Sequence, residues 1–266
     1  MKIFFITATD TDAGKTITSA ALMKQYSWAH YWKPVQTGAD RDAEMVRTLS
    51  GRDAKFFHPG LTFSRPLSPH RAAELDGKQI LLEDLDNAFQ KVVDSVNSFD
   101  SRESTIAPGP DDQSASGPGF DGSGPAVQSA RTPEDTAAGR KKESILFIEG
   151  AGGLLVPLNR SSLWPDWLAE KPLSLILVCR TGLGTINHSL LSIEAIRKRN
   201  LDLTGLVFFG PENPDNQKTI AEFSGVPVLG QLSLEYSLES ESGSGPDDQQ
   251  DPVIPDTLDY KQIIQG

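Results

Sequence analysis

The sequence predicts an α/β fold with a mostly parallel central sheet flanked by helices. Short apolar runs that suit buried strands, such as residues 2–8 (KIFFITA) and 145–148 (ILFI), alternate with stretches whose apolar residues have helical spacing. Strands that alternate with helices are typical of parallel sheets joined by right-handed crossovers. A length of 266 residues suits one such domain, and a hydrophobic fraction of 38% indicates that part of the chain lies outside its core.

The first half of the chain is expected to begin with a strand, a loop and a helix. The expected elements in order are a strand over 2–8, a helix within DAGKTITSAALMKQY (12–26), an extended piece HYWKPVQTG (30–38), a short helix over 42–49 and an amphipathic helix over 81–99.

The second half continues the alternation. Its expected elements are a strand in SILFIEGAGG (144–153) that ends at Glu149, a strand in LSLILVCRTGLG (173–184), a helix over 186–200, a strand and loop over 203–213, a helix near 216–223 and a strand in VPVLGQL (226–232). Ligands of such sheets bind at the carboxyl ends of the strands, so the candidate site is expected there.

Two segments have a different composition. Residues 100–143 are rich in Gly, Pro, Ser and Asp and lack apolar periodicity, which predicts a disordered insert. Residues 237–266 form a second acidic, low-complexity segment with a C-terminal tail, and the pentapeptide GPDDQ occurs in both segments. One domain is therefore expected from residues 1–99 and 144–236.

Charge and cysteine content exclude several classes of protein. Lys and Arg total 25 against 36 Asp and Glu, a net charge of -11, which gives no electrostatic basis for binding nucleic acid. No apolar run is long enough to span a membrane, so no membrane partner is expected. The single cysteine, Cys179, excludes an internal disulfide and fits a core position in a cytoplasmic protein.

The segment ATDTDAGKT (8–16) has the residues of a phosphate-binding loop. Gly14, Lys15 and Thr16 open a helix directly after a strand, so free backbone N–H groups and the positive helix end can face a polyphosphate. Lys15 would neutralise phosphate charge and Thr16 would place its hydroxyl on Mg²⁺. The pattern predicts a P-loop NTPase fold that uses ATP, with nucleotide contacts from Asp12, Ala13, Gly14, Lys15, Thr16 and Ile17.

Two observations qualify this loop. The position where the regular pattern has its first glycine is Thr9, and the position of the second lysine of chromosome-partitioning ATPases is Asp10, which argues against that class. The alternative is an ordinary helix start in which Asp10 or Asp12 caps the helix.

The segment TATDTDAGKT (7–16) closely resembles the loop of dethiobiotin synthetases. Further segments follow in that family's order: YWKPVQTG (31–38), LSPHRAA (67–73), IEGAGGLLVPL (148–158), GLGTINHSLLS (182–192) and VLGQL (228–232). The resemblance implies that 7,8-diaminononanoate, CO₂ and ATP give dethiobiotin, ADP and phosphate, through a carbamate that attacks the γ-phosphate. Two anions must meet in that reaction, so fixed positive charge is expected to contribute most to catalysis.

The resemblance assigns the charged and hydroxyl groups of the site. Lys33 matches the family's active-site lysine and, with Lys15, would hold the carbamate and γ-phosphate. Without the motif, Lys33 would be interpreted as a solvated charged residue at the end of a strand. Thr37 matches a hydroxyl that contacts the diamine or its carbamate, and Thr11 would present loop groups to the same atoms. Either threonine could instead stabilise a turn through a hydrogen bond between its hydroxyl group and the nearby backbone.

Asp42 and Glu149 are the expected carboxylate ligands of Mg²⁺, beside Thr16. Glu149 ends an apolar strand, where an unpaired acid would be costly and a metal would explain its presence. Asp40 is a rival for Asp42, which could also be an N-cap. Gly150, Ala151 and Gly152 would allow close approach to substrate or nucleotide, or form a plain glycine turn.

The resemblance also implies a homodimer in which the partner subunit covers the hydrocarbon chain of the substrate. Leu183, Gly184, Ile186 and Asn187 match the covering residues. In the alternative, Leu183 and Ile186 are core residues and Asn187 caps the following helix. His70 and His188 match motif positions too, and both are interpreted as structural.

The nucleotide-base site departs from the family pattern. Phe209 and Gly210 stand where relatives usually place an Asn that reads adenine, and the usual proline of the later base-contacting loop is replaced in the segment Leu232, Ser233 and Leu234. A stacking ring carries little hydrogen-bond information, so relaxed base preference is expected. Two other functions stay open: an amidating synthetase of cobalamin assembly, and a nucleotide-dependent switch or scaffold.

Overall fold

The computed structural model describes residues 1–39, 41–103, 143–233 and 258. Asp40, Leu234, residues 104–142 of the predicted insert and all of the predicted C-terminal segment except Leu258 lie outside the described residues. Among the described residues, no helix is both long enough and apolar enough to cross a bilayer.

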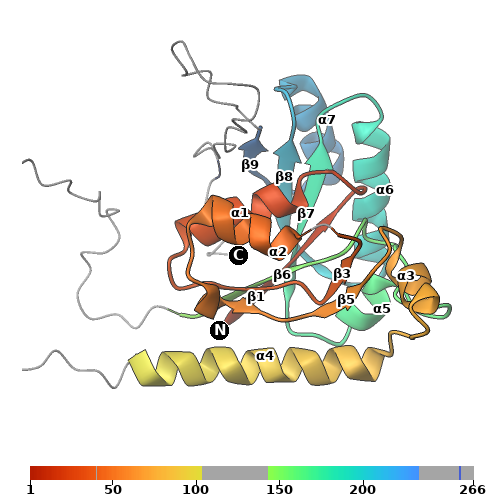
Figure 1. Ribbon diagram of the computed structural model, residues 1–266. Coiled ribbons are helices and arrows are strands. Elements are labelled where there is room, and N and C mark those ends of the chain that lie inside the picture. The colour runs from red at the N-terminus through yellow and green to blue at the C-terminus, as the bar shows by residue number, and fades with distance from the viewer. Residues whose placement is uncertain (40, 104–142, 234–257, 259–266) are drawn as a thin grey trace, which may run out of the picture.

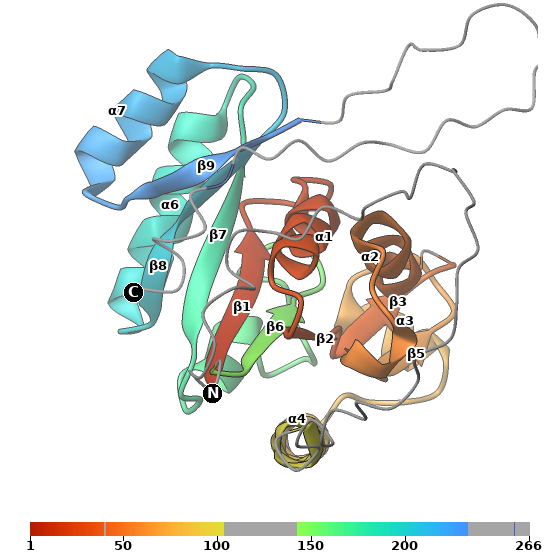
Figure 2. The same cartoon turned by 90° about the vertical axis from the view of Figure 1, so that its left-hand side faces the viewer.

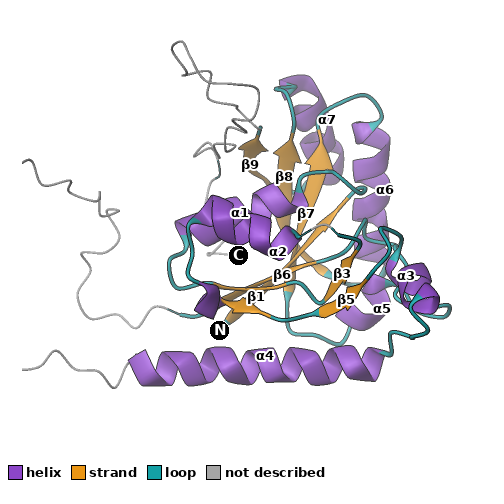
Figure 3. Cartoon of the chain, viewed as in Figure 1, coloured by secondary structure: helices purple, strands orange, loops and turns teal. Residues whose placement is uncertain are grey.

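A seven-stranded, all-parallel sheet forms the centre of the molecule (Figures 1 and 3). Its strands, in spatial order, are β4 (Phe57–His58), β2 (His30–Trp32), β6 (Ile145–Glu149), β1 (Lys2–Ala8), β7 (Ser174–Arg180), β8 (Asp202–Phe209) and β9 (Val228–Leu232). The predicted mostly parallel sheet is therefore confirmed, and its carboxyl edge gathers the loops that follow β1, β2, β6, β7 and β8.

The extended piece expected over residues 30–38 is two strands rather than one. β2 stays in the central sheet, whereas β3 (Val35–Thr37) pairs with β5 (Leu61–Phe63) in a separate two-stranded sheet. Pro34 lies between them and cannot donate to a strand ladder. The chain leaves the central sheet at Lys33, which places that lysine at its carboxyl edge.

Helices cover both faces of the sheet (Figure 2). The helices of the described residues are α1 (Lys15–Gln25), α2 (Asp42–Ser50), α3 (Pro69–Leu75), α4 (Leu82–Glu103), α5 (Trp164–Leu168), α6 (Thr185–Lys198) and α7 (Pro214–Ser224), with a 3₁₀ turn over Ala54–Phe56. Of these, α3 lies against the small β3–β5 sheet. The helix expected to end at residue 99 continues to Glu103, so the start of the predicted insert is helical.

Alternation along the strands divides the core in two. Phe5 of β1 packs with α4, α5 and α6 on one face, whereas Phe4 and Ile6 pack with α1 and α2 on the other, as the two-residue period of a strand requires. Leu258 is buried in the second core and bridges Gly230 of β9.

Candidate active site

A cavity of about 440 Å³ lies at the carboxyl edge of the sheet. It is lined by Thr11, Asp12, Gly14, Lys15, Thr16, Ile17, Lys33, Gln36, Thr37, Arg41, Asp42, Met45, Glu149, Ala151, Gly152 and Phe209. Most predicted site residues therefore meet in one place, as the position of their loops at the strand ends predicts.

The phosphate-binding loop leaves the start of α1 uncapped. The N-cap of α1 is Gly14, with a φ of 94° and no side-chain cap, so neither Asp10 nor Asp12 caps the helix and that alternative is wrong. A Cβ at Gly14 would lie 2.1 Å from Cγ of Phe209, so both the backbone and the ring require glycine here. The free N–H groups of the first turn can therefore bind an anion.

Lys15 is buried, and no carboxylate of the described residues forms an ion pair with it. Its Nζ donates to the backbone oxygen of Asp10 at 3.3 Å. Burial, opposed by the attraction of Glu149, lowers the pKa of Lys15. An ammonium group that is desolvated and unpaired by a carboxylate gains most from an incoming phosphate.

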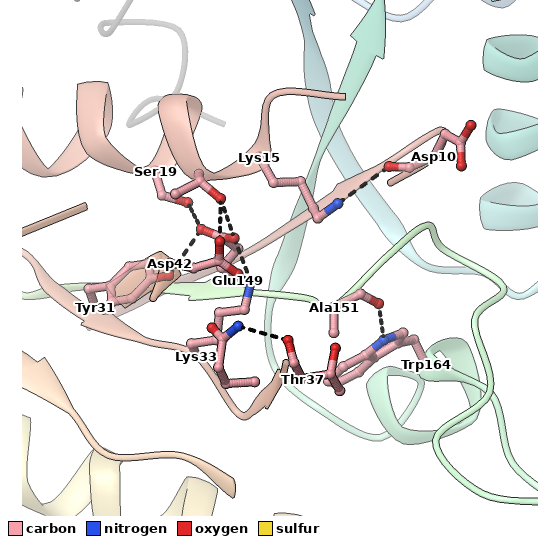
Figure 4. A network of polar contacts seen from close by, with 12 residues as sticks. Asp10, Lys15, Ser19, Tyr31, Lys33, Thr37, Asp42, Glu149, Ala151 and Trp164 are labelled. Carbon is pink, nitrogen blue, oxygen red and sulfur yellow. Dashed lines mark hydrogen bonds and ion pairs between the residues drawn. The ribbon is translucent and has the colours of Figure 1, made fainter. Parts of the chain in front are cut away.

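Glu149 is fully buried, and its two oxygens have different partners (Figure 4). Oε2 accepts from Ser19 Oγ at 2.6 Å and from the Tyr31 hydroxyl at 3.0 Å. Oε1 accepts from Lys33 Nζ at 2.8 Å and from Thr16 Oγ1 at 3.1 Å. Four donors explain how an acid can be buried at the end of an apolar strand.

Lys33 forms ion pairs with Asp42 and Glu149. Burial acts to lower the pKa of Lys33, but the two carboxylates outweigh it and the pKa is raised. Lys33 is therefore a fixed positive charge, and the interpretation as a solvated strand-end lysine is wrong. Gly60 supports this position, because a Cβ there would lie 1.8 Å from the Lys33 carbonyl oxygen.

The oxygen atoms of Thr16, Asp42 and Glu149 meet beside the loop. Thr16 Oγ1 lies 3.2 Å from Asp42 Oδ1 and 3.1 Å from Glu149 Oε1. Asp42 is not an N-cap, since Arg41 holds that position in α2. The described residues hold no group of three or more His, Cys, Asp or Glu side chains that could bind a metal ion together. A hydroxyl and two carboxylates nevertheless fit Mg²⁺, which uses few protein oxygens and completes its shell with water and phosphate.

Known proteins resemble this chain along most of its length. The family model described as an AAA domain matches residues 2–97 and 128–242. The ATP-dependent dethiobiotin synthetase BioD of Bradyrhizobium diazoefficiens is 36% identical over 87% of this chain and 86% of that relative. Proteins of the same name from Brucella anthropi and Christiangramia forsetii are 36% and 32% identical, over 87% and 88% of this chain and 85% and 88% of their own.

The chain belongs to the ATP-dependent dethiobiotin synthetase family. The predicted family, the P-loop fold class and the class of ATP-dependent ligase are thereby confirmed. The IEGAGG segment packs beside the phosphate loop, since Gly150 N donates to Ile6 O at 3.0 Å and Leu154 N to Ala8 O at 3.2 Å. Ala151 and Gly152 line the cavity, so the segment is more than a plain turn.

The GLGTINH segment, by contrast, does not line the cavity of this single chain. Leu183 and Asn187 are exposed, Gly184 is the N-cap of α6, and Ile186 is half-buried against the core. The alternative interpretation is therefore wrong for Leu183, which is not in the core, and for Asn187, which is not the cap.

Five other residues expected to contact nucleotide do not line the cavity: Ala13, Gly150, Gly210, Leu232 and Ser233. Leu232 is a core residue, and Gly210 N donates to its carbonyl at 2.9 Å. Among the described residues of this predicted base site, Phe209, which packs on Gly14, is the one that reaches the cavity.

Five polar side chains at the site were not anticipated, and two of these, Gln36 and Arg41, line the cavity. Ser19 and Tyr31 bind Glu149, and Arg180 donates from Nη2 to the Thr11 carbonyl at 2.6 Å and pairs with Asp10 at 3.7 Å. Spacing could have indicated two of them. Ser19 lies one helical turn after Lys15, and Tyr31 lies two strand positions before Lys33, hence on the same sides of their elements.

Proposed function

We propose that this enzyme carboxylates 7,8-diaminononanoate with CO₂ and closes the ureido ring at the expense of ATP. One observation carries the proposal: Lys33 and Lys15 place two buried cations at one cavity beside an uncapped helix start. Such an arrangement suits the meeting of a carbamate with a triphosphate, because preorganised positive charge stabilises the negative charge that both bring.

The chemistry balances without a further reactant. One amine adds to CO₂ and loses a proton to give a carbamate, whose oxygen attacks the γ-phosphorus while the bond to ADP breaks. The second amine then attacks the carbamoyl carbon and expels phosphate. Lys33 would orient the carbamate and γ-phosphate, and Lys15 with the α1 amides would hold the phosphate chain.

Thr16, Asp42 and Glu149 would hold Mg²⁺, which neutralises phosphate charge when bound. Lys33 pairs with both carboxylates, so its ammonium and the metal would share them. Thr11 and Thr37 line the cavity and would contact the amines or the carbamate. Phe209 would stack on the base and give a relaxed preference among nucleotides.

A homodimer would complete the substrate site. Leu183 is fully exposed, and Asn187 is exposed in the first turn of α6. Burying such an apolar side chain removes an unfavourable contact with water. In the dimer, Leu183, Gly184, Ile186 and Asn187 of each chain would cover the hydrocarbon tail bound by its partner.

The amidating synthetases are a poorer fit. Their usual glutaminase needs a cysteine nucleophile, whereas Cys179 is fully buried in β7 and burial raises its pKa to about 12. A thiol in that state is inert. The switch or scaffold is a poorer fit too, because the chain belongs to a family of ATP-dependent ligases.

Phosphate release from ATP, Mg²⁺ and bicarbonate, with and without the diamine, separates these functions. We expect release that depends on the diamine, matches dethiobiotin formed, and falls about 10³-fold in Lys33→Ala. The matched control is Lys24→Ala, which removes an exposed lysine at the far end of α1. Release that ignores the diamine would instead favour the switch.

A further inference from the structure

The two oxygens of Glu149 divide their contacts between the protein interior and the cavity. Oε1 touches Lys33 and Thr16, which line the cavity. Oε2 touches Ser19 and Tyr31, which do not line it. Two hydroxyl groups on the interior side therefore hold Oε2, while Oε1 lies on the cavity side of the carboxylate.

Both hydroxyl groups come from rigid, buried elements. Ser19 is fully buried on α1, one turn beyond Lys15. Tyr31 is fully buried in β2, where it pairs with Phe147 of β6 and with Phe57 of β4 and packs on the Phe57 ring at 5.4 Å between centroids. Neither donor can move away without disturbing an element that also builds the site.

The plane of a carboxylate is loosely held by its own torsion, since the last χ angle of Glu is broad and roughly two-fold. Two donors on Oε2 remove that freedom, because turning the plane would break both bonds. The bond at 2.6 Å from Ser19 is short, as is usual for a hydroxyl that donates to an ionised oxygen.

We propose that Tyr31 and Ser19 are positioning residues that fix the Glu149 carboxylate so that Oε1 alone serves Lys33, Thr16 and the divalent cation. Neither residue lines the cavity. This inference rests on the proposed use of the site, and it adds two residues to its machinery. Residues that hydrogen-bond to a metal ligand commonly affect metal affinity and activity almost as strongly as the ligand itself.

Tyr31→Phe and Ser19→Ala each delete one hydroxyl. Thr18→Val is the matched control, because Thr18 is a buried neighbour of Ser19 on α1 whose hydroxyl has no partner among the described residues. We expect kcat to fall about 10-fold in each test variant, with the KM of the diamine within about two-fold, and no change in Thr18→Val.

Mn²⁺ binding to the protein in the presence of ATP is a measurement that needs no diamine. It can be monitored by the loss of the electron paramagnetic resonance signal of free Mn²⁺. We expect about 10-fold weaker Mn²⁺ binding in Tyr31→Phe and Ser19→Ala, and wild-type binding in Thr18→Val. Removing both hydroxyls should cost more than removing either one.

Unchanged kcat and unchanged Mn²⁺ binding in Tyr31→Phe and Ser19→Ala would overturn the inference. So would equal losses in Thr18→Val, which would show a general packing effect. The proposed function fails separately, if wild-type protein makes no dethiobiotin, and the Mn²⁺ titration still tests the two positioning residues in that case.

Discussion

The two sides of the candidate site are built in different ways. On one side, Glu149 is fully buried and receives four donors, and Lys33 is paired with two carboxylates. On the other side, Thr11 is exposed and Phe209 is half-buried at the cavity, and Leu183 of the GLGTINH segment is exposed outside the cavity. We call these the carboxylate wall and the open wall.

The difference separates what one chain can complete from what it leaves to a ligand or partner. Each charge of the carboxylate wall has a partner within the fold, so that wall is preorganised before any ligand arrives. The open wall exposes an apolar leucine and part of an aromatic ring. These side chains contribute stabilising contacts only when a ligand or a partner subunit covers them and removes them from water. Phosphate and metal should therefore need one chain, and the diamine tail and the base should depend on the open wall.

The largest expected effect comes from removing the cation of the carboxylate wall. Lys33→Met keeps an apolar side chain but removes the ammonium group that pairs with Glu149 and Asp42. We expect the free energy of unfolding to fall by about 3 kcal/mol or more. Without Mg²⁺ we expect a clearly lower melting temperature. Added Mg²⁺ should then stabilise Lys33→Met more than wild type, because the metal replaces the missing charge.

Melting curves with and without Mg²⁺ measure this directly, and Lys24→Met at the exposed end of α1 is the control. Equal stabilisation of Lys33→Met and wild type by Mg²⁺ would mean that Lys33 and the metal do not share the two carboxylates.

The next effect should come from the open wall. Leu183→Asp puts a charge where the proposed partner subunit covers the substrate, so we expect a shift toward monomer and a KM for the diamine that is about 10- to 100-fold higher. The KM of ATP should stay close to wild type. Sedimentation and steady-state kinetics check both parts.

Leu75→Asp is the matched control, since Leu75 is an exposed leucine on α3, outside the GLGTINH segment. A Leu183→Asp enzyme with an unchanged diamine KM would show that the open wall is complete in one chain.

The sequence predicted the carboxylate wall better than the open wall, for physical reasons. A Gly-Lys-Thr helix start and an acid at the end of an apolar strand are local patterns, and the parallel sheet brings their ends together. Contacts across elements are harder to anticipate. The bonds of Ser19 and Tyr31 to Glu149 join residues 130 and 118 positions apart, and that of Arg180 to Thr11 spans 169.

Expected contacts that lie away from the cavity have the same explanation. Leu232 was expected at the base and is a core residue, since a leucine in a strand points inward or outward according to a register that the family order does not give. The expected strand over 30–38 is split at Lys33 and Pro34, where proline was the available signal.

A smaller effect concerns the strand behind the carboxylate wall. His30 of β2 is buried with Phe56, Phe99 and His58 around it, and burial, with the nearby His58 and Arg52, lowers its pKa to about 4. The unfolded chain binds this proton near pH 6.5, so folding stability should fall as the pH drops from about 6.5 toward 4.

We expect about 1 kcal/mol less stability at pH 5.5 than at pH 7.5 from this group. Denaturant unfolding at both pH values measures the loss, which His30→Phe should remove and His188→Phe, at an exposed position on α6, should retain. An equal pH dependence of the free energy of unfolding in His30→Phe and wild type would show that other titratable groups cause the loss of stability at low pH. Any loss of activity at low pH would then have a cause outside β2.

The smallest expected effect is at the base. Phe209 packs on Gly14 and lines the cavity, where a ring can stack on any base and an amide could read one. Phe209→Asn should therefore raise the preference for ATP over other nucleoside triphosphates by a few-fold, with some loss of affinity for each because stacking is lost. Ratios of kcat/KM for ATP, GTP and CTP test this, and Phe223→Asn, at an exposed ring on α7, is the control. A wild-type enzyme that already rejects GTP and CTP would contradict the stacking role, because selection would then come from groups other than the ring.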